Sequence, residues 1–146
     1  MDETRQRRLQ SRFPMLYRDL GMKDSSLFYG LGVGDGWFDL LWKLSEDLEK
    51  LDPALVASQV KEKFGTLRFY LFQSDLEMRH EAGDMFSFAP QAKDKRVQER
   101  IRLAEKQSGS TCEKCGAPGK LHQDGYWHVA CANCEKKALI KRMMRI

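Results

Sequence analysis

Apolar residues recur with helical spacing most clearly between residues 37 and 51. The positions on this stripe lie three or four residues apart and are Trp37, Leu41, Leu44, Leu48 and Leu51. Because an α-helix repeats about every 3.6 residues, this spacing predicts an amphipathic helix over 37–51. Phe38 and Trp42 form a second apolar pair, one turn apart and away from the stripe. We expect these two aromatic side chains to be buried, and contact with a partner is the alternative.

Two other segments carry weaker helical patterns. A first helix is predicted over 3–20, with an apolar side formed by Leu9, Phe13, Leu16, Tyr17 and Leu20. Pro14 interrupts this run, because proline has no amide proton and clashes with the preceding turn, so the segment could be two short helices that meet there. A charged helix is predicted over 92–107, where a thin apolar line is formed by Val97, Ile101 and Ala104.

Between these helices the apolar pattern changes to the two-residue period of a β-strand. Leu67, Phe69 and Leu71 alternate with polar residues. Together with the preceding segment, this alternation predicts a hairpin over about 55–72. Residues 74–90 are polar and follow neither period, so a loop is predicted there.

Glycine occupies every second position from Gly30 to Gly36. Glycine-rich stretches can cradle phosphate, but this one lacks the Gly-Lys-Ser/Thr ending of a P-loop and the G-x-G-x-x-G spacing of a dinucleotide-binding turn. We therefore interpret it as a flexible approach to the following helix, with Asp35 as the N-cap.

All the cysteines of the chain lie in two C-x2-C pairs, which are Cys112 with Cys115 and Cys131 with Cys134. Thiolates three residues apart on a tight turn bind one cation, and two such turns complete a tetrahedral shell that suits one structural Zn2+. Two disulfides are the alternative. The first ten residues lack the apolar segment of a signal peptide, however, and a cytoplasmic protein keeps its thiols reduced.

Two histidines, His122 and His128, lie between the cysteine pairs. Either could replace a cysteine as a ligand, but four thiolates already complete the shell, so we expect both at the surface. The elements together predict an α+β fold, in which helices pack on a small β-hairpin or sheet. This core is predicted over 1–108, and a zinc-ribbon or treble-clef module with a basic terminal helix over 109–146.

The formal net charge of +4 belongs to the predicted zinc module. Residues 109–146 carry seven basic and three acidic side chains, whereas residues 1–108 carry eighteen of each. Four thiolates with one Zn2+ add two negative charges, so electrostatic attraction to nucleic acid is weakened. No apolar run approaches the roughly 20 residues that span a bilayer. We expect a protein of the bacterial cytoplasm, of bacterial or viral origin.

The terminal helix of the module supplies most of the candidate binding residues. Its basic side chains are Lys136, Lys137, Lys141, Arg142 and Arg145. They could lie along phosphates while Trp127 stacks on an exposed base. The apolar residues of the helix are Leu139, Ile140, Met143 and Met144. These could dock on the core or enter a groove of a partner protein. Phe38 and Trp42 are the remaining candidate partner contacts.

Three stretches carry a family resemblance. They are Gly34-Asp-Gly-Trp-Phe38, then Gln59-Val-Lys-Glu-Lys-Phe-Gly-Thr-Leu-Arg-Phe-Tyr70, and residues 104–108 running into 112–119. The chain resembles, in these stretches, a family of small proteins encoded by phages and prophages. The resemblance implies a viral accessory role, in which the protein binds and redirects a component of the host cell.

A binding function is predicted rather than a catalytic one. Every cysteine is assigned to the metal, and a shell of four protein ligands leaves no open position for a substrate. We expect a non-enzymatic protein, stabilised by zinc, that binds a host macromolecular complex, with inhibition of a bacterial defence system as the specific hypothesis. The alternative is a nucleic-acid-binding regulator of transcription.

Overall fold

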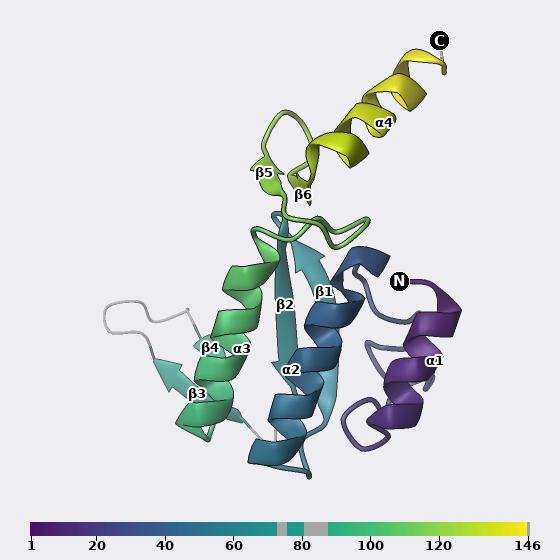
Figure 1. Ribbon diagram of the computed structural model, residues 1–146. Helices are drawn as coiled ribbons and strands as arrows, with labels where there is room; N and C mark the ends of the chain where they lie inside the picture. Colours follow the sequence, from purple (N-terminus) through teal and green to yellow (C-terminus); the bar gives the residue numbers. More distant parts are fainter. Residues whose placement is uncertain (73–75, 81–87, 146) are drawn as a thin grey trace.

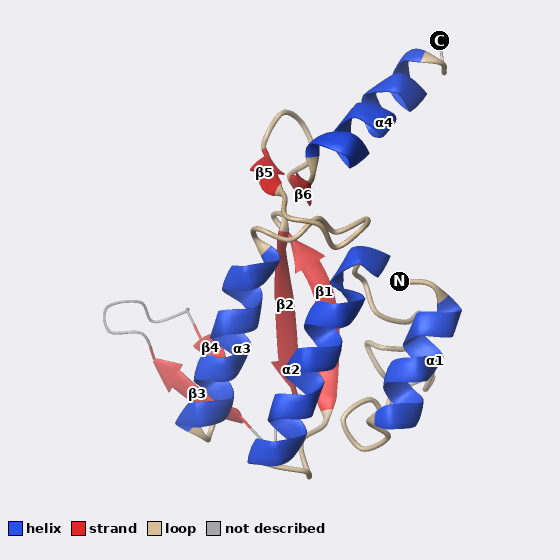
Figure 2. Ribbon diagram, in the orientation of Figure 1, coloured by secondary structure: helices blue, strands red, loops and turns tan. Residues whose placement is uncertain are grey.

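The computed structural model describes residues 1–72, 76–80 and 88–145 and has the predicted α+β class (Figures 1 and 2). The helices are α1 (Glu3–Arg12), the short 3-10 helix η1 (Asp35–Trp37), α2 (Phe38–Leu51), α3 (Lys95–Ser108) and α4 (Ala132–Met143). The strands are β1 (Ala57–Lys63), β2 (Thr66–Leu71), β3 (Leu76–His80), β4 (Phe88–Ala92), β5 (Lys120–His122) and β6 (His128–Ala130). Within the described ranges they form three antiparallel pairs, β1–β2, β3–β4 and β5–β6.

Helix α2 lies at the centre of the core, as its apolar stripe predicts. Trp37, Leu41, Leu44 and Leu48 are fully buried. Helices α2 and α3 lie side by side on one face of the β1–β2 hairpin, and α1 packs beside α2 (Figure 1). An ion pair of 2.7 Å between Arg100 Nε and Asp47 Oδ2 links the two central helices at their surface.

The β1–β2 hairpin turns at Phe64 and Gly65, which both have positive φ angles, of 53° and 83°. Its inner face contributes Val60, Leu67, Phe69 and Leu71 to the core. Helix α3 satisfies the open edge of β2, because the Leu67 amide donates to Ser108 Oγ (2.8 Å) and the Phe69 amide to Glu105 Oε1 (3.3 Å). A helix therefore covers an edge that would otherwise be free to pair with another strand.

The first helix is shorter than the predicted 3–20 segment. It ends at Arg12, and residues 13–21 form turns instead of continuing the helix. Pro14 explains this end, since the residue before a proline avoids the helical region, and Phe13 has φ −125° and ψ 66°. The apolar side chains of the turns still reach the core, where Leu16 and Tyr17 are buried.

The prediction of a loop over residues 74–90 is wrong for residues 76–80 and 88–90, which belong to strands β3 and β4. Their backbones pair in register from Leu76 with Ala92 to His80 with Phe88. Strand pairing depends on backbone hydrogen bonds, so it does not require the apolar alternation that this segment lacks. The rest of the predicted loop, 74–75 and 81–87, lies outside the described residues. Because β4 extends to Ala92, helix α3 begins at Lys95 rather than at residue 92, with Asp94 as its N-cap.

Asp35 is not the N-cap that the sequence predicts for the central helix. It begins η1, for which Gly34 is the cap residue without any side-chain capping bond. Its carboxylate instead accepts a hydrogen bond from the Asp2 amide (2.7 Å). Asp2 is the N-cap of α1, so this bond ties the start of α1 to the glycine-rich stretch.

A buried hydroxyl pair between the first turns and α2 gives a testable prediction. Ser45 Oγ donates to the Leu41 carbonyl (2.6 Å) and accepts from the Tyr17 hydroxyl (2.7 Å), and burial raises the pKa of Tyr17, so it stays neutral. Ser45→Ala is expected to lower the free energy of unfolding by about 1–3 kcal/mol, because it leaves the tyrosine hydroxyl without a partner.

Tyr17→Phe is expected to lower the free energy of unfolding by only about 0.5–1.5 kcal/mol, because Ser45 keeps its hydrogen bond to the Leu41 carbonyl. In the double variant the loss should be smaller than the sum of the single losses. Urea unfolding of the four proteins measures these differences. Additive losses would show that the two hydroxyl groups do not interact.

Candidate metal centre

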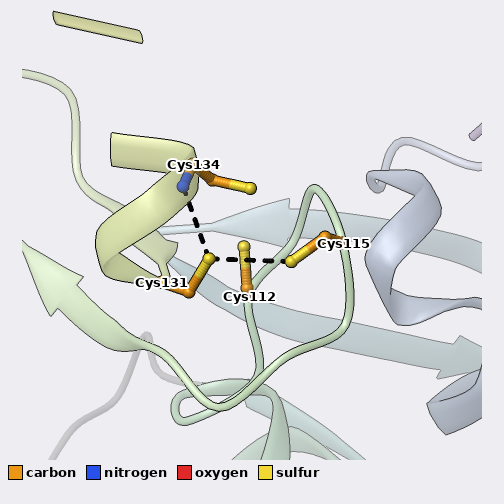
Figure 3. A group of neighbouring side chains, drawn as sticks. All are labelled: Cys112, Cys115, Cys131 and Cys134. Carbon is orange, nitrogen blue, oxygen red and sulfur yellow. Dashed lines mark hydrogen bonds between the residues drawn. The ribbon is translucent and has the colours of Figure 1, made fainter. Parts of the chain in front are cut away.

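The four cysteine sulfur atoms converge on one point, as the two C-x2-C pairs predict (Figure 3). All four Sγ atoms lie within 4.8 Å of one another, and Cys115 Sγ lies 3.6 Å from Cys131 Sγ. Metal–sulfur bonds of about 2.3 Å in a tetrahedron place the sulfur atoms about 3.8 Å apart. The four residues therefore fit a shell that could hold one metal ion.

Local backbone structure sets the direction of each thiol. Cys112 and Cys115 belong to a turn closed by the Gly116 amide, which donates to the Cys112 carbonyl (2.8 Å), and Gly116 has a φ of 81°. Cys131 is the N-cap of α4, and its sulfur accepts from the Cys134 amide (3.4 Å). The turn thus positions the sulfur atoms of Cys112 and Cys115, and the start of α4 positions those of Cys131 and Cys134.

The electrostatics of the four thiols favour a bound cation. Burial opposes ionisation of Cys112, but the amides of Cys131, Cys115 and Lys114 outweigh it and lower the pKa of Cys112 to about 6. Burial and hydrogen bonds with the other thiols raise the pKa of Cys134 to about 12. Four clustered thiols do not all ionise unless a positive charge lies between them, and a divalent ion provides that charge.

The two histidines lie outside the sulfur cluster. Their rings stack at 5.1 Å. His128 Nδ1 lies 2.8 Å from the Tyr126 carbonyl, and Nε2 lies 2.7 Å from the Glu135 carboxylate, which raises the pKa of His128. His122 Nε2 lies 3.3 Å from the Ala130 carbonyl. These contacts join β5, β6 and α4 to one another, so the histidines support the module around the cysteines.

The cysteine turn docks on the glycine-rich stretch before α2. The Gly36 amide donates to the Glu113 carbonyl (2.7 Å), and the Gly34 amide to the Glu113 carboxylate (3.0 Å). The indole of Trp37 donates to the Thr111 carbonyl (2.9 Å). A Cβ atom on Gly36 would lie 2.2 Å from the Cys112 carbonyl oxygen. The stretch is thus a close contact surface for the metal centre, and its interpretation as a flexible approach is wrong.

A second contact joins the β5–β6 hairpin to the turn of β1–β2. The Tyr126 hydroxyl donates to Glu62, and the rings of Trp127 and Phe64 form an edge-to-face pair at 5.9 Å. Trp127 remains 41 % exposed and Phe64 63 % exposed. The candidate residue Trp127 therefore lies against the hairpin turn, with part of its surface still accessible.

Helix α4 extends away from the rest of the protein and has no buried residue (Figure 1). Its candidate basic residues are all exposed, and within the described chain none forms an ion pair. Leu139 and Ile140 are about half exposed, and Met143 and Met144 are more so. The alternative in which the apolar side of this helix docks on the core is wrong for this structure.

The aromatic pair of α2 lies between α1 and α2. Phe38 is 8 % exposed, and the guanidinium of Arg8 lies over its ring at 4.8 Å. Trp42 packs edge-to-face on Phe13 at 5.2 Å and is partly buried. Phe38 is therefore a core residue, as the sequence analysis predicted. Trp42 is the member of the pair that keeps part of its surface accessible to a partner.

Comparisons with protein-family models, with curated proteins and with solved structures find no match to this chain. In the described part of the chain, no helix combines the length and the apolar character needed to cross a membrane.

Proposed function

We propose that the protein is a non-enzymatic binding protein whose C-terminal module is held together by one structural Zn2+. Four cysteine thiolates in a tetrahedral arrangement are the usual ligands of structural zinc. The cluster supports this identity, because its sulfur atoms lie within 4.8 Å of one another and cytoplasmic thiols stay reduced. With four protein ligands the ion has no open position, which favours a structural role over a catalytic one.

The exposed helix α4 carries the proposal of a binding function. Large apolar side chains on a surface helix usually face a core or a partner, and here they face solvent. The helix is anchored near its start, by Cys131 and Cys134 and by the contact of Glu135 with His128, so the metal centre helps to fix the direction in which it points. An amphipathic helix fixed at one end can lie in a groove of another protein.

The side chains of α4 indicate what kind of surface its partner would have. Leu139, Ile140 and Met143 require an apolar groove floor, and Lys137 and Lys141, which lie one turn apart beside Ile140, favour an acidic rim. The resemblance to small phage and prophage proteins extends the proposal to a protein complex of the bacterial host. A defence system is the specific candidate, and the bacterial cytoplasm is the proposed location.

Substitutions on α4 test this proposal. Leu139→Glu with Met143→Glu is expected to abolish capture of the partner from a host lysate treated with nuclease. It should also weaken binding to the purified partner at least tenfold, because two buried contacts become charged. Lys120→Glu, an exposed change elsewhere in the module, should bind like the wild type. Equal binding of the purified partner by the α4 variant would exclude α4 as the contact.

Nucleic-acid binding through α4 is the second candidate. It rests on the exposed lysine and arginine side chains of the helix, which form no ion pair in the described structure. Replacing Lys137 and Lys141 by Gln would then weaken binding to DNA or RNA and reduce its salt dependence. Capture of a protein that survives nuclease treatment and these two substitutions favours the first candidate.

A further inference from the structure

The β1–β2 hairpin has a second face, opposite the one that α2 and α3 cover (Figure 1). The register places three cross-strand pairs on this outer face, which are Gln59 with Tyr70, Lys61 with Arg68, and Lys63 with Thr66. Their neighbours Val60, Leu67 and Phe69 point into the core, so the alternation of the strands fixes these six side chains outward. Each of the six keeps part of its surface exposed.

The outer face is positively charged. Lys61, Lys63 and Arg68 lie on it, and none of the six residues is acidic. In the described structure these cations contact rings and neutral oxygens instead of carboxylates. Lys61 Nζ lies 5.9 Å from the centre of the Tyr70 ring, and Arg68 donates to Thr66 Oγ1 (2.6 Å).

The neighbouring carboxylates are engaged elsewhere. Glu62 accepts from the Gly65 amide (2.6 Å) and from Tyr126, and Glu105 accepts from the Phe69 amide at the edge of β2. Arg68 also attracts the Glu105 carboxylate, but none of the six outer-face residues is acidic, so the face keeps a net positive charge. It is available to an anionic partner.

Aromatic rings lie at both ends of this row of cations. Tyr70 is at one end, and Phe64 with Trp127 forms a partly exposed pair at the hairpin turn. Lys63 Nζ lies 5.6 Å from the centre of the Phe64 ring, so the charged and aromatic surfaces are continuous. A purely electrostatic site for an acidic protein does not require exposed rings, whereas unstacked bases bind to such rings.

The geometry points to this outer face as a binding site for single-stranded nucleic acid. The phosphates contact Lys61, Lys63 and Arg68, and the bases stack on Tyr70 and on the Phe64–Trp127 pair. Single strands are the appropriate form, because a duplex keeps its bases stacked on each other and away from the rings. This site is separate from α4, so it is independent of the binding function proposed above.

Fluorescence anisotropy with labelled single strands of about 12 nucleotides tests the site in the zinc-loaded protein. Lys61→Gln with Arg68→Gln is expected to weaken binding at least tenfold. With three phosphate contacts, the slope of log affinity against log salt is expected to be about −2, and this double variant should reduce it to about −0.7. Tyr70→Val, which keeps a strand-forming residue, is expected to weaken binding about 5- to 100-fold.

The matched control is Lys43→Gln with Lys50→Gln, two exposed lysines of α2, the helix that covers the inner face of the hairpin, and it should bind the single strand like the wild type. Unchanged melting temperature and zinc content show that each variant is folded. The proposal is overturned if the wild type binds no single strand, or if Lys137→Gln with Lys141→Gln on α4 loses binding while Lys61→Gln with Arg68→Gln keeps it. Polyphosphate that binds as tightly as the oligonucleotide would also overturn it, since bases would then contribute nothing. Parallel measurements with DNA and RNA strands identify the preferred sugar.

Discussion

Removal of the proposed Zn2+ is expected to unfold residues 109–146 and leave the helical core folded. The module buries few apolar side chains, and its buried apolar and cysteine residues are Cys112, Val129 and Ala130. Structural zinc contributes roughly 10–16 kcal/mol to small peptide modules, whereas a whole domain is stable by about 5–15 kcal/mol. Without the ion, the module therefore lacks the contacts that would keep β5, β6 and α4 ordered.

Two-dimensional NMR of the protein before and after chelation measures this loss. Native mass spectrometry should first show one Zn2+ per chain, and none after chelation. Amide signals of β6 and α4 are expected to collapse, while those of Leu44 and Leu48 remain protected from exchange. The Trp37 indole signal should shift, because its acceptor, the Thr111 carbonyl, belongs to the segment that unfolds.

Two variants test which residues bind the metal. Cys112→Ser should reproduce the chelated state, and His122→Ala should keep the metal because that ring lies outside the sulfur cluster. A β6 that stays protected after verified metal loss would mean that packing alone holds the module. Zinc loss in the histidine variant would mean that the shell differs from four thiolates.

The sequence predicts those elements in which the spacing of the residues itself shows which side chains are buried or converge on one site. The stripe through Leu41, Leu44 and Leu48 indicates a buried helix because only one helix face can reach the core. The alternation through Leu67 and Phe69 indicates one buried strand face for the same reason. The cysteine spacing predicts their convergence, because ligands three residues apart on a turn already point to a common centre.

Other features depend on contacts between distant segments, and spacing along the chain does not reveal them. Pro14 shows that the first helix is disturbed but not that it stops completely. The pairing of β3 with β4 is carried by backbone groups, which every sequence has. The contact between Gly36 and the cysteine turn involves segments more than seventy residues apart, as the Trp37–Thr111 hydrogen bond shows. A glycine at a tight interface and a glycine in a flexible loop are identical in the sequence.

Gly36→Ala is expected to separate the metal module from the core. The added Cβ atom would lie 2.2 Å from the Cys112 carbonyl oxygen and 2.7 Å from the Cys115 amide nitrogen. These are backbone atoms of the metal-binding turn, so no side-chain rotation relieves the overlap. The turn must move away, which breaks the hydrogen bond from the Gly36 amide to Glu113 and strains the bond from Trp37. We expect a loss of about 2–4 kcal/mol in the free energy of unfolding.

Gly32→Ala is the matched control, because it lies in the same glycine-rich stretch. Its Cβ atom would lie 3.5 Å from Lys61 Cβ, an ordinary van der Waals contact, so its stability should change by less than about 1 kcal/mol. Urea unfolding compares the stability of the two variants, and competition with a coloured chelator compares their affinity for zinc. The Gly36 variant should release zinc more readily, since the docked surface supports the turn that presents Cys112 and Cys115. Equal stability and equal zinc retention in both variants would show that the module binds its metal without support from the core.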